Sequence, residues 1–176
     1  MTEIKKYPKP LIAIHWLTVL LFVFVFVRGK MLEDYDFNET NMDRYRMHAI
    51  PGILILILTV IRIFVKNRYK NSLPVAITYY NNTHKIMVNL VIKLIYILLI
   101  LTPLVGFVMI FQTGAMDYDF GGAFPTDAHF NDTLEVLHKG FMMSLLILIV
   151  IHIVGVVLYK FKTGENLVKR MCVFLK

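Results

Sequence analysis

Four long apolar stretches, separated by polar segments, dominate the pattern of the chain. They cover about residues 11–28, 48–66, 85–112 and 137–160. A membrane-spanning helix needs about 20 predominantly apolar residues to cross the hydrocarbon core of a bilayer, and somewhat shorter spans occur. The pattern therefore predicts an all-α integral membrane protein, a four-helix bundle that forms a single transmembrane domain over residues 1–176.

The first apolar stretch also has some features of a signal peptide. Lys5, Lys6 and Lys9 precede it, as in the basic region of such a peptide. The residues that follow it, Arg28–Gly29–Lys30, lack the small-x-small pattern of a cleavage site. We therefore expect this stretch to be retained as the first membrane helix.

Charged residues are distributed unevenly between the two sides of the predicted bundle. With four spans, both termini and the middle loop lie on one side, which holds twelve basic residues and only two acidic ones, Glu3 and Glu165. The opposite side holds five basic and ten acidic residues. The positive-inside rule therefore predicts that both termini are cytoplasmic. The net charge of +7 comes from residues that flank the spans, so we expect the lipid bilayer, and no nucleic acid, as a partner.

Four histidines lie in or at the edges of the apolar stretches, at two depths. His15 and His152 lie toward the inner side, and His48 and His138 lie at the outer side. The fourteen residues between His138 and His152 correspond to about 21 Å of helix and to two heptads, so both side chains point to nearly one face. A hydrogen bond to a neighbouring helix would satisfy one such imidazole. Two pairs matched by depth favour metal ligation instead.

Haem fits these pairs better than zinc does. Zinc prefers four clustered ligands, and the spans contain no acidic residue or cysteine that could join two histidines. Two trans imidazoles complete the axial coordination of a haem iron and leave no open position, which favours electron transfer. The sequence thus predicts two haem b groups, with His15 and His152 as ligands of the inner iron and His48 and His138 as ligands of the outer iron.

Basic residues near each pair are candidates for the haem propionates. Arg62 lies near the inner end of the second stretch, and its guanidinium is predicted to bond a propionate; Lys93 is a weaker candidate for the same role. The alternative for Arg62 is that it extends to the lipid headgroups. Arg44, Arg46 and Lys139 flank the outer pair, where they could bind propionates, steer a small anion such as superoxide, or form an ordinary solvated face.

Four other residues have ordinary explanations. Trp16, beside His15, fits a haem edge or an interfacial anchor. Tyr96 is expected to serve packing rather than redox chemistry. His84 and His129 are expected at the surface.

An ordered set of motifs accompanies the four histidines. They are AIHWL (13–17), H-x-x-x-G (48–52), VIR (60–62), P-x-x-G (103–106), the spacing of His138 and His152, and N-L-x-x-R-M (166–171). Together they resemble the bacterial cytochrome b561 family over nearly the whole chain. The resemblance implies a multi-pass, di-haem protein of the bacterial inner membrane that exchanges electrons with quinone, and it implies the same histidine pairs. In the superoxide oxidases of this family, electrons pass from periplasmic superoxide to ubiquinone.

Two places depart from the family pattern. Ile92 stands where members often have a histidine on the third helix, and Tyr159 and Lys160 stand where they often have a pair of histidines. These positions could contact a quinone or a propionate, so the resemblance does not supply a quinone site for this chain.

The function expected from the sequence is therefore that of a membrane di-haem b-type cytochrome. The specific expectation is a superoxide:ubiquinone oxidoreductase, with ubiquinone as co-substrate. The alternative is a non-enzymatic electron conduit or membrane anchor for a partner dehydrogenase or reductase. A metal transporter is a third possibility, disfavoured because the spans contain no acidic residue.

Overall fold

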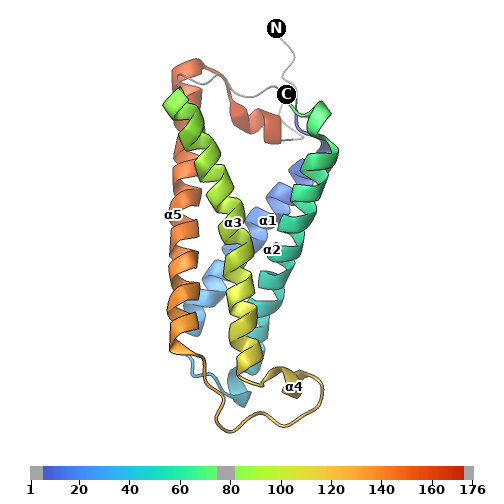
Figure 1. Cartoon of the computed structure of the whole chain (residues 1–176), viewed down its shortest axis with the longest axis vertical. Helices are drawn as coiled ribbons and strands as arrows, with labels where there is room; N and C mark the ends of the chain where they lie inside the picture. Colours follow the sequence, from blue (N-terminus) through green and yellow to red (C-terminus); the bar gives the residue numbers. More distant parts are fainter. Residues whose placement is uncertain (1–5, 75–81, 173–176) are drawn as a thin grey trace.

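The computed structural model describes residues 6–74 and 82–172. Four long helices and four short ones make up the described part of the chain, which contains no strand (Figure 1). The long helices are α1 (Lys9–Leu32), α2 (Met42–Arg68), α3 (Asn82–Gln112) and α5 (Asp132–Thr163). The short ones are η1 (Glu39–Asn41), η2 (Lys70–Ser72), α4 (Met116–Asp119) and η3 (Leu167–Met171). The predicted all-α membrane bundle is confirmed.

Each of the four long helices is long and apolar enough to cross a membrane. The helices extend a few residues beyond most of the apolar stretches; α1, for example, continues past residue 28 to Leu32. Lengths of 24 to 32 residues correspond to about 36–48 Å of helix. That length covers the hydrocarbon core and part of the headgroup regions, where polar residues can continue a helix.

The four long helices are antiparallel along the chain (Figure 1). The start of α1 and the end of α5 lie at one end of the bundle, which we call the terminal end. α4 lies at the opposite end, which we call the loop end. The closely packed pairs are α1 with α2, α3 with α5, and α2 with α3. The cytoplasmic position of the terminal end stays a prediction from charge. Three residues that enter that charge count, Glu3, Lys5 and Lys176, lie outside the described residues.

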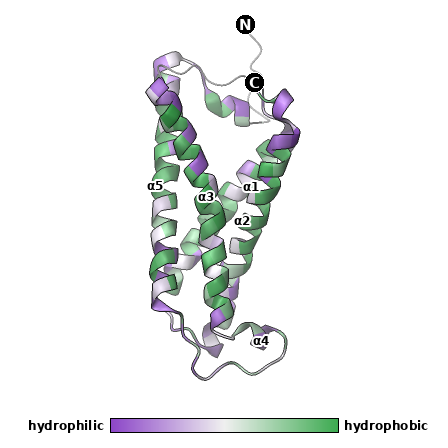
Figure 2. Cartoon of the chain, viewed as in Figure 1, coloured by the Kyte–Doolittle hydropathy of each residue, from purple (hydrophilic) through white to green (hydrophobic). Residues whose placement is uncertain are grey.

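Most of the apolar surface of the bundle faces outward. Hydrophobic residues cover the middle of every long helix, and hydrophilic ones gather near both ends (Figure 2). Large side chains such as Phe64, Leu20 and Val150 are 72%, 68% and 52% exposed. Helices that are hydrophobic on all sides are typical of a lipid environment, so this chain is a multi-pass membrane protein.

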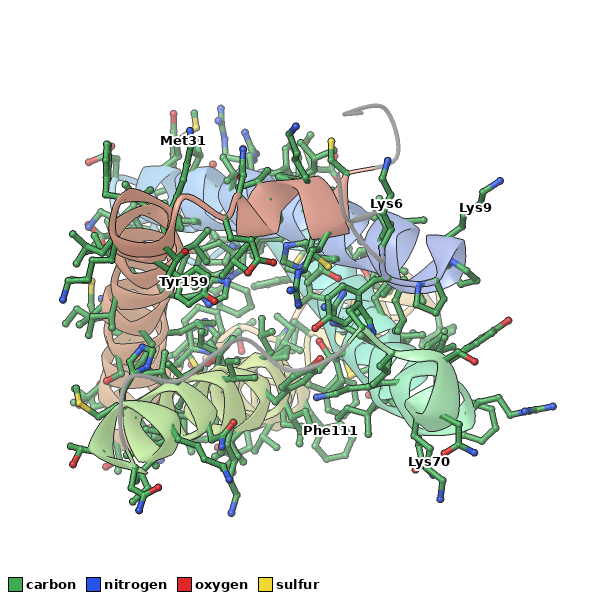
Figure 3. The ribbon with its side chains drawn as sticks, turned by 90° about the horizontal axis from the view of Figure 1, so that it is seen from above. Lys6, Lys9, Met31, Lys70, Phe111 and Tyr159 are labelled. Carbon is green, nitrogen blue, oxygen red and sulfur yellow. The ribbon has the colours of Figure 1, made fainter. Side chains whose placement is uncertain are left out.

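The C-terminal segment closes the terminal end. Gly164 ends α5 with φ of 75°, a left-handed conformation that favours glycine, and its N–H donates to the Lys160 carbonyl at 2.9 Å. The chain then turns and places η3 across this end of the bundle, toward the start of α1 (Figures 1 and 3). Trp16 Nε1 donates to the Met171 carbonyl at 2.7 Å, and the Tyr7 N–H donates to the Arg170 carbonyl at 3.0 Å. These bonds tie the two ends of the described chain together.

The loop end is held by aromatic packing and an ion pair. Phe37 packs on Tyr45, Phe124 and Phe130, with ring centres 4.9, 5.6 and 4.3 Å away. The Arg46 guanidinium bonds the Asp119 carboxylate, with Nε 2.7 Å from Oδ1. The loop after α1 is therefore packed against the loop before α5.

Candidate functional site

Two of the predicted ligands, His48 and His138, come together at the loop end. His48 lies in the second turn of α2, and His138 lies in the second turn of α5. Their ring centres are 6.1 Å apart, and the ring planes are inclined by 75°. α2 and α5 are far apart in the sequence, so the folding of the bundle brings these two histidines together.

Hydrogen bonds orient both rings in the same way. His48 Nδ1 lies 3.0 Å from the Val25 carbonyl oxygen of α1, and His138 Nδ1 lies 2.9 Å from the Thr102 carbonyl oxygen of α3. A carbonyl only accepts, so each Nδ1 carries the proton and donates it. In the neutral ring this leaves Nε2 unprotonated and able to bind a metal.

A glycine lies against each of these rings. A Cβ added to Gly29 would lie 2.8 Å from His48 Cε1, and one added to Gly106 would lie 2.9 Å from His138 Cε1. Each glycine follows by four residues the residue whose carbonyl accepts from that histidine. The two histidines thus make the same two contacts with one turn of a neighbouring helix: Nδ1 bonds a carbonyl, and Cε1 lies beside the glycine four residues later.

The other two predicted ligands lie toward the terminal end. His15 is in the second turn of α1, and His152 lies about two thirds of the way along α5. Both are half-buried and lie within range of electrostatic interaction with the Arg62 guanidinium; His15 is also within that range of His152. The structure therefore gathers His15, His152 and Arg62 into one region. The α1 and α5 backbones are not closely packed against each other there.

Arg62 connects three helices at this depth. Its Nε donates to the Tyr96 hydroxyl of α3 at 2.9 Å, and its Nη1 donates to the Leu11 carbonyl of α1 at 2.9 Å. No carboxylate in the described ranges pairs with it. A guanidinium held inside a membrane bundle without an anion is costly, and a haem propionate would supply the missing charge.

The separation of the loop-end rings is compatible with two imidazoles that share one haem iron. An imidazole nitrogen binds a first-row metal at about 2 Å, and it lies about 1 Å from the centre of its own ring. Two imidazoles bound to one iron from opposite sides would therefore have ring centres about 6 Å apart. The observed separation is 6.1 Å. No group of three or more His, Cys, Asp or Glu side chains that could hold a metal ion by themselves occurs among residues 6–74 and 82–172. Two ligands per iron leave the remaining positions to a porphyrin.

Unsatisfied polar atoms also lie near the loop-end pair. The hydroxyls of Thr18, Thr59 and Ser144 each donate to the carbonyl four residues earlier. By contrast, the buried Thr102 Oγ1 has no hydrogen-bond partner in the described structure, and neither has the buried Nε of Arg28. Buried polar groups are normally satisfied, so these two atoms are compatible with a polar group bound nearby.

The remaining predicted basic residues do not share one role. Arg46 bonds Asp119 and also Asp43, and Lys139 Nζ lies 2.7 Å from a Glu135 carboxylate oxygen. Arg44 lies over the Tyr35 ring, with Cζ 4.0 Å from its centre. Lys93 is exposed on α3. Arg46 and Lys139 are thus largely neutralised, which weakens the steering of an anion by these two side chains.

The aromatic and histidine residues given ordinary explanations are located as follows. Trp16 packs beside the His15 ring, with centres 5.4 Å apart, while its indole N–H anchors Met171. Tyr96 accepts from Arg62. His84 is half-buried at the start of α3, and His129 is exposed in the loop before α5.

Three residues of the loop-end site were not assigned to it from the sequence. Arg28 and Gly29 were considered as parts of a poor cleavage site, with Arg28 also counted among the basic residues of the outer side, and Gly106 was considered as part of the P-x-x-G motif. A signal was present: Gly29 directly follows the first apolar stretch and Gly106 lies in the third, both near the depth of the outer histidines, where a bulky neighbour would collide with a ring.

The similarity of this chain to known proteins extends over all three helices that carry the four histidines. The family model described as prokaryotic cytochrome b561 matches residues 6–172. The chain belongs to the prokaryotic cytochrome b561 family. It is also 27% identical over 179 residues to a Yersinia pestis protein named "Probable superoxide oxidase CybB", and the match covers 95% of this chain and 96% of that protein.

As a member of this family, the protein is a bacterial membrane cytochrome b. Haem b is the cofactor of the family, and electron transfer is its chemistry. Haem supplies a one-electron carrier whose potential depends on axial ligands, hydrogen bonds and burial. The paired histidines, their oriented Nδ1 atoms and the cations near them are the residues of this chain that suit such a group.

Proposed function

We propose that the protein is a di-haem cytochrome of the bacterial inner membrane that passes electrons from superoxide to ubiquinone. His48 and His138 would hold the haem nearer the loop end, the loop-end haem. His15 and His152 would hold the terminal-end haem. The observation that carries the proposal is the 6.1 Å separation of the His48 and His138 rings, with each Nδ1 bonded to a carbonyl and each Nε2 available to iron.

The position of the histidines supports transfer across the membrane. On α5 the two ligands are separated by about 21 Å of helix, so two haems would lie at different depths of one bundle. Porphyrin edges would be closer than the irons. The terminal end would face the cytoplasm, and superoxide would react at the opposite, loop end.

The overall reaction balances without any further reactant. Two superoxide anions release two electrons and become two molecules of dioxygen. One ubiquinone takes up these electrons and two protons and becomes ubiquinol. No acidic residue lies in the described apolar spans, so the protons would reach the quinone through water or surface groups. Superoxide as donor rests on the name of the Yersinia pestis relative.

The test starts with the purified protein and a pyridine-haemochrome spectrum. We expect about two haem b per chain, because each iron needs two of the four histidines. An enzymatic superoxide source should then reduce the haems and, with added ubiquinone, produce ubiquinol. Superoxide dismutase should abolish ubiquinol formation.

The other outcomes separate the alternatives. One haem per chain would mean that one histidine pair is structural. Two haems that superoxide does not reduce, but that a co-purified dehydrogenase or reductase does, would favour an electron conduit or anchor for that partner. Absence of haem from protein made with ample haem would reject electron transfer by this chain.

Arg62 permits a separate prediction at the terminal end. Tyr96→Phe removes one hydrogen bond to a charged donor, which should lower the free energy of unfolding by about 1.5–3 kcal/mol. Arg62→Gln should do this too and should also lower the redox potential of the terminal-end haem, because a cation near iron favours the reduced state. Thermal unfolding in detergent and a redox titration of both variants measure the two effects. Equal potentials in the two variants would make Arg62 a helix-bridging residue only.

A further inference from the structure

Arg28 is a basic residue near the loop-end histidines, and the proposed function assigns it no role. It lies in the last turns of α1, next to Gly29, which supports the His48 ring. Its guanidinium is within electrostatic range of that ring. Arg28 is therefore close to the loop-end histidine pair.

The partners of Arg28 are unusually weak for a guanidinium. Nη1 lies 3.9 Å from the Met31 sulfur, and Nη2 lies 3.6 Å from the Met47 sulfur. The buried Nε has no hydrogen-bond partner in the described part of the chain. A thioether is a weak acceptor, whereas a guanidinium has five N–H donors that fit the two oxygens of a carboxylate. The side chain is thus held in place without an anion.

Most of the other cations at this end already have anions. Lys30 pairs with Glu33 at 2.6 Å, Lys139 pairs with Glu135, and Arg46 pairs with Asp43 and Asp119. The same Lys30 bond lowers the pKa of the Glu33 carboxyl, which stays ionised beside it. Arg44 lies over the Tyr35 ring, with Cζ 4.0 Å from the ring centre. Among the basic residues of this end, Arg28 combines proximity to His48 with the absence of a carboxylate partner in the described ranges.

We propose that Arg28 binds a propionate carboxylate of the loop-end haem, with Met31 and Met47 holding its guanidinium in position. This proposal rests on the presence of that haem, and it adds a residue that fixes the haem's orientation and potential. The neighbouring Gly29 then seats one axial ligand while Arg28 neutralises one peripheral charge. Two consecutive residues of α1 would thus contribute to binding the same cofactor. A phospholipid phosphate at the membrane surface offers similar chemistry, so the test must distinguish the two sources.

The test compares Arg28→Gln with Arg28→Lys and with Arg44→Gln, which removes the same charge at the same end. All three variants are first assayed for two haems per chain, which tests the proposed function separately. In a redox titration, Arg28→Gln should reduce the equilibrium constant for reduction of the loop-end haem about tenfold, or about 59 mV for one electron. Arg28→Lys should restore most of it. The resonance Raman band of propionate bending should shift in Arg28→Gln and stay unchanged in Arg44→Gln.

Several results would overturn the proposal. An unchanged potential and an unchanged propionate band in Arg28→Gln would reject propionate binding and leave lipid phosphate as the remaining candidate anion. Equal shifts in Arg28→Gln and Arg44→Gln would show a general charge effect. If Arg28→Gln fails to retain the loop-end haem, recovery of that haem in Arg28→Lys supports the proposal, and equal loss in both variants contradicts it.

Discussion

Replacing His48 or His138 by alanine should remove the same haem and leave the other haem in place. Each substitution would delete one of the two proposed ligands of the loop-end haem, and the two rings lie 6.1 Å apart. Haem content should fall from about two to about one per chain, because a b-type haem has no covalent link to the protein and depends on its axial bonds. Pyridine-haemochrome spectra and redox titrations measure both the loss and which component disappears.

The matching substitutions test the terminal-end pair. His15→Ala and His152→Ala should both remove the second component, and a combination such as His15→Ala with His48→Ala should remove both. His129→Ala serves as the control, because His129 is exposed in a loop. The pairing would be wrong if His15→Ala and His48→Ala abolished the same spectral component. Ubiquinol formation from superoxide should fail in every variant that lacks either haem.

Gly106→Ala and Gly29→Ala should each displace the loop-end haem while every histidine is still present. The added methyl groups would lie 2.9 Å from His138 Cε1 and 2.8 Å from His48 Cε1. Carbon atoms do not approach so closely, so the ring must move, and the Nδ1 bond to Thr102 or Val25 must lengthen with it. We expect loss of most loop-end haem or, at the least, a changed low-spin iron signal in electron paramagnetic resonance.

Gly140→Ala and Gly155→Ala are matched controls on α5. A Cβ at either position would meet nothing within 4 Å. Both should keep two haems, and the gain in helix propensity over glycine, about 1 kcal/mol in water, should not lower stability. If Gly106→Ala bound haem as well as Gly140→Ala, the ring would have room to adjust, and the role given to Gly106 would be rejected.

The arrangement of the spans was predictable because it depends on long-range composition. Every apolar stretch became a helix, and the depths of the histidines followed from counting residues at a fixed rise. The structure then brought His48 and His138 together as expected from depth. What counting residues could not provide is rotation about each helix axis. That rotation sets which side chain faces Gly29 or Gly106, and it depends on packing between helices.

The ion pairs of the loop end were equally hidden in the sequence. Arg46 and Lys139 were candidates for steering an anion, and nothing in their spacing showed that Asp119, 73 residues after Arg46, would bond it. Arg28 was overlooked for the opposite reason: its relevance comes from lacking an anion, which only a three-dimensional structure reveals. The path of the C-terminal tail also depends on the three-dimensional structure. Gly164 ends α5 and redirects the chain, so η3 crosses the bundle end and is tied to α1.

The packing of the long helices has a consequence for how the protein is made. α1 and α2 form one closely packed pair, α3 and α5 form another, and α2 also packs on α3 between the two pairs. Each proposed haem takes one ligand from the first hairpin and one from the second, so cofactor binding is thermodynamically linked to docking of the two hairpins. The supply of haem during biosynthesis would then govern how much of the newly inserted chain reaches its mature form, and cells short of haem would accumulate loosely joined hairpins open to membrane proteases.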